Sequence, residues 1–156
     1  MAKKKRPGQR QRPEQSSPSQ PQWRPIAFLP LIARHIDGML EADREQYETL
    51  LQARPKPYVL DGFTVDRVIA AFTTQQQDFG LFDEQLRQWQ ALELSEDQRR
   101  EVTRLVEQMR LLRENNEQVL ALARELQQGT IEKVMVQSDV ELGLEMLMRM
   151  SREQQR

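Results

Sequence analysis

The chain has 156 residues and no cysteine, and 38% of its residues are hydrophobic while 30% are charged. This length supports one hydrophobic core, and the lack of cysteine excludes disulfides, thiolate nucleophiles and cysteine-based zinc sites. The longest apolar run, 26–33, contains Pro30 and is far shorter than the roughly 20 residues of a membrane-spanning helix. No apolar segment follows the basic N-terminus as in an export signal, so we expect a cytoplasmic protein that does not enter the membrane.

Charge divides the chain near residue 25. Residues 1–25 carry seven Lys or Arg against the single Glu14, a net charge of +6, whereas the rest of the chain carries −7. The segment has few apolar side chains to offset the entropy of ordering, so we expect a disordered Pro/Gln-rich basic tail. Two roles stay open for it. It is either a solubilising leader or an arm that contacts nucleic acid through its cations, namely Lys3, Lys4, Lys5, Arg6, Arg10 and Arg12.

The region after the tail begins with the pattern of a long amphipathic helix. Pro30 is tolerated in a first helical turn, and the extended Pro55-Lys56-Pro57 ends the pattern. We therefore predict a helix over 30–53. Its apolar positions form one stripe: Ile32, Ile36, Met39, Leu40, Tyr47, Leu50 and Leu51.

A second stripe predicts a helix over 64–92, with Thr64 as its N-cap. From Val65 to Trp89 its eight positions follow alternating steps of three and four, and Gln75 is the polar one among them. The helix has to continue through Gly80, at a cost of about 0.5–1 kcal/mol relative to Ala.

A third helix is predicted from Ser95 to just before Gly129. Ser95 and Gln98 fit a capping box, and the stripe that follows contains one polar residue, Asn116. The link between the second and third helices is too short for anything but an antiparallel return. The two helices should therefore form a long hairpin.

The polar residues of the two stripes fall in neighbouring layers of this hairpin. We expect Gln75 and Asn116 to lie within one turn of each other and to hydrogen-bond, which would fix the register at some cost in stability. The alternative is a polar ligand pocket between the helices, to which Arg113 would also contribute.

The C-terminal segment is unusually apolar. Thr130 is expected to cap a short turn, and a capping-box pattern at Ser138 predicts a short helix over 138–150. Its polar residues form one narrow line, so apolar side chains occupy most of its circumference. We expect this helix to lie in a groove of the bundle and close one end, or to join two subunits. The candidate partner-binding residues are Leu144, Leu147, Met148 and Met150.

Catalytic motifs are absent from the sequence. The only histidine, His35, has no Glu-x-x-His motif or nucleophile elbow around it, and the glycines form no phosphate-binding loop. We expect no catalytic residues, metal ligands or cofactor, and hence no enzyme. His35 is interpreted as a half-buried helix residue.

The sequence thus predicts an all-α protein. Residues 26–151 form a three- or four-helix bundle, built on the antiparallel hairpin with a third helix alongside and a short C-terminal helix, between the tail 1–25 and a polar end, 152–156. Our hypothesis is a non-catalytic helical interaction or adaptor protein that binds another protein or itself, a homodimer included. Two alternatives stay open: a nucleic-acid-associated protein that uses the basic arm, and a small-ligand binder or enzyme that uses the layer of Gln75 and Asn116.

Overall fold

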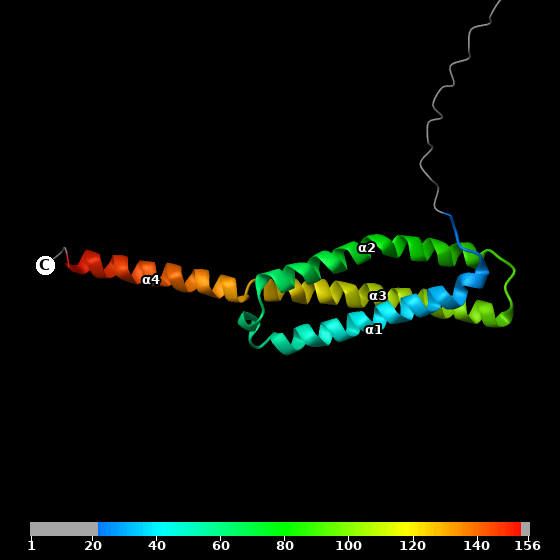
Figure 1. The fold of residues 1–156 in the computed structure, drawn as a ribbon, viewed down its shortest axis with the longest axis horizontal. Coiled ribbons are helices and arrows are strands. Elements are labelled where there is room, and N and C mark those ends of the chain that lie inside the picture. The colour runs from blue at the N-terminus through cyan, green and yellow to red at the C-terminus, as the bar shows by residue number, and fades with distance from the viewer. Residues whose placement is uncertain (1–21, 154–156) are drawn as a thin grey trace, which may run out of the picture.

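The computed structural model describes residues 22–153, which contain helices and no strand (Figure 1). The four long elements are α1 (Leu29–Ala53), α2 (Gly62–Gln90), α3 (Glu96–Gln127) and α4 (Ile131–Glu153). Two short 3-10 helices, η1 (Ile26–Phe28) and η2 (Pro57–Val59), precede α1 and α2. The predicted all-α class is confirmed.

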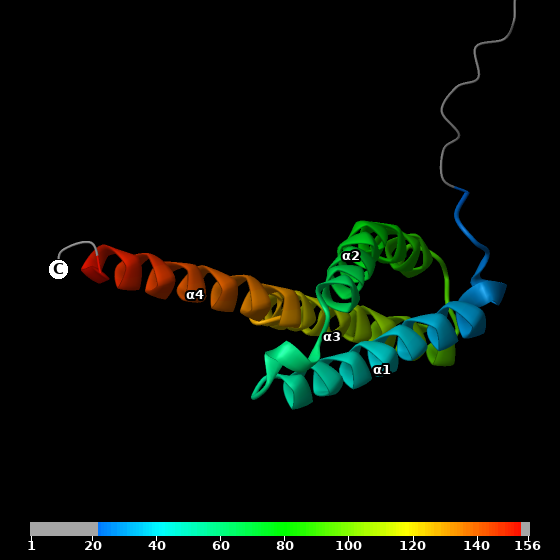
Figure 2. The ribbon, with the colours of Figure 1, turned by 60° about the vertical axis from the view of Figure 1, so that its left-hand side comes forward.

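The helix α3 is the centre of the bundle. Both α1 and α2 pack along it, with α1 running in the same direction as α3 and α2 in the opposite one (Figures 1 and 2). Accordingly, α3 carries more buried side chains than either neighbour. The predicted hairpin of α2 and α3, with α1 alongside, is present.

Local capping explains where the hairpin helices begin. Ser95 and Gln98 form the predicted capping box, with reciprocal hydrogen bonds of 3.2 and 3.0 Å. At the start of α2, however, the N-cap is Asp61 rather than Thr64, because the Asp61 carboxylate accepts a hydrogen bond of 2.6 Å from the Thr64 backbone N–H. The carboxylate also carries the charge that a helix N-terminus favours.

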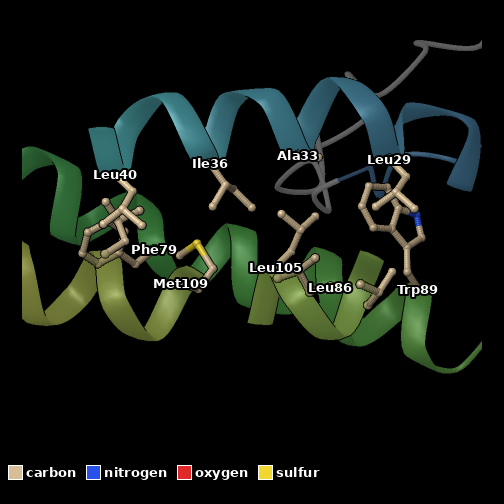
Figure 3. Packing of buried hydrophobic residues seen from close by; sticks show 11 residues of the cluster. Leu29, Ala33, Ile36, Leu40, Phe79, Leu86, Trp89, Leu105 and Met109 are labelled. Atoms are coloured by element: carbon tan, nitrogen blue, oxygen red, sulfur yellow. The ribbon is translucent and has the colours of Figure 1, made fainter. Parts of the chain in front are cut away.

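The core consists of two hydrophobic clusters. The hairpin-end cluster joins side chains of all three bundle helices near the α2–α3 turn (Figure 3), with Ile36, Leu105 and Met109 at its centre. The second, the α4-end cluster, lies toward α4 and contains Leu50, Val65, Val119, Leu122, Ala123 and Leu126. The α2 helix passes through Gly80 without a break, as predicted.

The chain enters the bundle at the hairpin end. The backbone N–H of Arg24 donates to Gln85 Oε1 (2.7 Å), and the Arg24 carbonyl accepts from Trp89 Nε1 (2.8 Å). Residue 24 is thereby held beside the last turns of α2. The α4 helix leaves from the opposite end of the bundle (Figure 1).

The prediction for the C-terminal helix was wrong in length and position. The helix begins at Ile131 and spans 23 residues, so the capping-box pattern at Ser138 lies inside it. Residues 132–137 contain no proline, and their side chains are compatible with an α-helix, so the helix can begin before Ser138. Instead of lying in a groove of the bundle or closing its end, α4 projects away from it (Figures 1 and 2).

Two glycine-to-alanine variants should change stability in opposite directions. Gly80 lies inside α2, and a Cβ there would have no neighbour within 4 Å, so Gly80→Ala should stabilise the fold by about 0.5–1 kcal/mol. A Cβ on Gly129 would lie 2.5 Å from Pro57 Cγ, so Gly129→Ala should destabilise by about 1–3 kcal/mol. Urea unfolding measures both; a loss of stability in Gly80→Ala would contradict the packing described for α2.

Candidate partner-binding helix

The α4 helix leaves the bundle through a joint that is packed against the segment before α2. Gly129 lies against the ring of Pro57, which leaves no room for a Cβ. Thr130 is only 1% exposed, and its hydroxyl donates to the Gln127 carbonyl (3.3 Å). The backbone N–H of Ile131 donates to the carbonyl of Leu60 (3.1 Å). These contacts fix the first residues of α4.

A carboxylate of α4 completes this attachment. Glu132 accepts a hydrogen bond of 2.8 Å from the backbone N–H of Gly62, the first residue of α2. An acid at a helix N-terminus is stabilised by the unpaired N–H groups there. We call the contacts of residues 129–132 with Pro57, Leu60 and Gly62 the joint clamp. The clamp holds the start of α4, so that the rest of the helix extends away from the bundle.

Every residue of α4 is exposed. Its large apolar side chains are between 38% and 65% accessible, and among them are the predicted Leu144, Leu147, Met148 and Met150. The full set is Ile131, Val134, Met135, Val136, Val140, Leu142, Leu144, Met146, Leu147, Met148 and Met150. Soluble monomeric proteins rarely expose so much contiguous apolar surface.

Charge and apolar character are separated around α4. At about 100° per residue, Glu141, Glu145, Arg149 and Arg152 lie along one side of the helix. On the diametrically opposite side, residues follow one another at alternating intervals of four and three, which is the spacing of a helix-packing stripe. We call this side the apolar seam; it consists of Val136, Val140, Gly143, Leu147 and Met150.

Sequence reasoning missed a cleft beside the root of α4. The cleft lies between the start of α2 and the start of α4, and its lining includes Phe63, Asp66 and Lys133. Phe63 is 71% exposed and has Arg67 over its ring at 5.7 Å. Phe63 does not belong to the α2 stripe. An aromatic residue outside the stripe was the one sequence feature that could have indicated this cleft.

The predicted polar pair lies inside the bundle, between the two hydrophobic clusters. Asn116 Nδ2 donates to Gln75 Oε1 (2.6 Å) and to the Phe72 carbonyl (3.0 Å). The structure adds a third member, because Gln75 Nε2 donates to Asp43 Oδ1 of α1 (3.1 Å). Asp43 occupies a position of the buried α1 stripe between Leu40 and Tyr47, which was the available signal. We call these three side chains the polar layer.

Asp43 is the one acid of the polar layer, and burial raises the pKa of its carboxyl. Desolvation raises the pKa of its carboxyl from 3.8 to about 6, although the hydrogen bond from Gln75 acts in the opposite direction. The second carboxyl oxygen, Oδ2, has no hydrogen-bond partner, and neither has Oδ1 of Asn116. The layer is therefore incompletely paired when Asp43 is ionised.

Other candidate residues take structural roles. Arg113 forms an ion pair with Asp83 and lies over the ring of Phe79 at 5.6 Å, so it does not join the polar layer. His35 is exposed rather than half-buried as interpreted, and its ring stacks on that of Phe82, with centroids 5.5 Å apart. The tail cations Lys3, Lys4, Lys5, Arg6, Arg10 and Arg12 lie outside the described residues.

Two searches of residues 22–153 were negative. No three His, Asp or Glu side chains in this part of the chain are grouped so that they could hold a metal ion. None of its helices combines the length and the hydropathy that crossing a membrane requires.

The raised pKa of Asp43 gives a pH-dependent prediction. Folded Asp43 binds its proton more tightly than the unfolded chain, so its contribution to stability is complete below pH 3.8 and is lost as the pH rises through about 6. Asp43→Asn keeps the shape and removes the charge, and should stabilise the protein at pH 7 by about 1–2 kcal/mol, with a smaller gain at pH 4. Urea unfolding between pH 4 and 8 measures the difference.

Asp37, on the same helix, provides a control for which the opposite change in stability is expected. Asp37 accepts two hydrogen bonds from Arg104 (2.9 and 2.8 Å), which lower the pKa of its carboxyl. Asp37→Asn should therefore lose stability at neutral pH, by up to about 1 kcal/mol because the pair is partly exposed. A gain from Asp43→Asn that is equal at pH 4 and pH 7 would contradict the role given to Asp43.

Comparison with protein-family models, with curated proteins and with solved structures gives no match to this chain. The exposed α4, the joint clamp and the polar layer are therefore the features from which a function can be argued.

Proposed function

We propose that this protein is a non-catalytic interaction protein of the cytoplasm and that α4 is its partner-binding element. The observation that carries the proposal is the exposure of eleven large apolar side chains along a helix whose start is fixed to the bundle. A cytoplasmic location is in keeping with the cysteine-free composition.

The hydrophobic effect supports this proposal. Each Å² of apolar surface removed from water contributes about 25 cal/mol, and α4 extends for about 35 Å with apolar side chains on most of its circumference. A partner that covers this helix gains that free energy. Because α4 is already helical and its first turn is held by the joint clamp, binding requires less ordering than the folding of a disordered segment.

The kind of apolar residue also supports protein binding. Four of the exposed side chains are methionines: Met135, Met146, Met148 and Met150. Methionine is flexible and polarizable, and it is common on surfaces that pack against other proteins. In helix-in-groove recognition, anchor residues at helical spacing enter an apolar groove of the partner.

A double substitution in α4 tests this function. Leu144→Glu with Leu147→Glu should weaken association of α4, with its own kind or with another protein, at least tenfold, because both charges would have to be desolvated. The midpoint of bundle unfolding should not change, since both leucines are exposed. Sedimentation and affinity capture with the purified chain measure association.

A matched control distinguishes the effect of charges placed on α4 from the effect of charges placed at exposed leucines elsewhere. Leu81 on α2 is 54% exposed and Leu92, just after α2, is 50% exposed, so the double variant Leu81→Glu with Leu92→Glu adds the same two charges to the bundle surface. It should leave association unchanged. Equal loss in both variants, or no loss in either, would count against α4 as the binding element.

The charge of the tail supports a second candidate function, association with nucleic acid. The tail carries +6, and Arg24 is held at the hairpin end, away from α4. Binding of the full chain to duplex DNA should weaken with salt, with a log–log slope of up to about −5 if six cations contact phosphates. Deletion of residues 1–21 should abolish binding; affinity that survives the deletion would assign it to another surface.

A further inference from the structure

We propose that the partner of α4 is α4 of a second copy of this chain, packed antiparallel along the apolar seam with Gly143 at the centre. This inference rests on the proposed function, and it adds the identity of the partner, the face and the direction of packing.

The side chains of two apolar seams complement one another in size when the two copies run in opposite directions. With Gly143 opposite Gly143, Val136 of one copy faces Met150 of the second, and Val140 faces Leu147. Each layer then combines a shorter, β-branched side chain with a longer one, which fills the space between two helices evenly. Parallel packing would place Val against Val and Met against Met, with narrow layers in the N-terminal half of the seam and wide layers in the C-terminal half.

Gly143, like Gly38 and Gly80, has no contact within its own chain that requires a glycine. A Cβ on this residue would meet nothing within 4 Å, and glycine inside a helix costs about 0.5–1 kcal/mol relative to alanine. At the crossing point of two helices, however, the missing side chain lets the backbones approach closely. The proposed interface therefore accounts for a residue that local helix stability disfavours.

Charge also favours the antiparallel direction. Residues 131–141 carry three acids and one lysine, a net charge of −2, whereas residues 145–153 carry two acids and two arginines, a net charge of zero. Antiparallel packing places the acidic half of one helix beside the neutral half of the other, which avoids repulsion between the two acidic halves. Parallel packing would place like charges side by side.

The position of the bundles also favours antiparallel packing of the two α4 helices. Because α4 extends from one end of the bundle, antiparallel packing leaves the two bundles at opposite ends (Figure 1). Parallel packing would bring the bundles against each other.

Disulfide trapping tests the direction, and the native chain contributes no cysteine of its own. Two single variants, Val136→Cys and Met150→Cys, are oxidised separately and as a mixture. A disulfide needs Cα atoms within about 7 Å, so antiparallel packing about Gly143 should cross-link only the mixture. Cross-linking of Met150→Cys with itself would show parallel packing and would overturn the inference, as would a dimer that cross-links under none of these conditions.

Gly143→Leu tests the crossing point. Leucine is a better helix former than glycine, so it should not disturb α4 itself, yet it should weaken self-association at least tenfold by holding the helices apart. Ser138→Leu, which adds the same side chain on the charged side of the helix without changing a charge, is the matched control and should leave self-association unchanged. Unchanged or tighter association of Gly143→Leu would overturn the inference.

The oligomeric state separates this inference from the proposed function. Sedimentation of the full chain should show self-association that the paired Leu144→Glu and Leu147→Glu substitutions abolish. A chain that stays monomeric at all concentrations would overturn the second copy as the partner. The proposed function would still stand in that case if those substitutions prevented the binding of a different protein, and it would fail if they prevented none.

Discussion

The availability of α4 depends on the joint clamp. A helix that follows α3 after only three residues could in principle turn back and cover its apolar side chains with its own bundle. Here Pro57 fills the space beside Gly129, and the Leu60 carbonyl and the start of α2 hold the first turn of α4. These few contacts hold the start of α4 in a direction that leaves its apolar surface uncovered by the bundle.

The three helices of the bundle could be predicted from the sequence because each buries one stripe and has a clear start or end. Steps of three and four placed Gln75 and Asn116 in neighbouring layers, and the two side chains are hydrogen-bonded in the structure. The capping box at Ser95 was identified for the same reason, since its two hydrogen bonds are local in sequence. Features that depend on residues close together in the sequence, such as caps and helical stripes, could therefore be predicted from the sequence alone.

The remaining features depend on contacts between distant segments, which no local pattern shows. Asp43 was not singled out from the sequence, although it lies on the buried α1 stripe between Leu40 and Tyr47 and is in the core. The start of α4 was missed because the capping-box letters at Ser138 resemble a helix start, whereas the chain is already helical there. The course of α4 is decided by Pro57 and Gly62, about 70 residues earlier in the chain.

The anchoring of Arg24 beside Trp89 would make the bundle a spacer of defined length if α4 binds a partner as proposed. The polypeptide that precedes residue 24 starts from one end, while α4 starts from the other, and α3 alone accounts for about 48 Å between them. Because α3 is packed against both neighbours along this distance, the spacer should be stiff. Two molecules held at its two ends would be kept apart by the length of one helix, without touching each other.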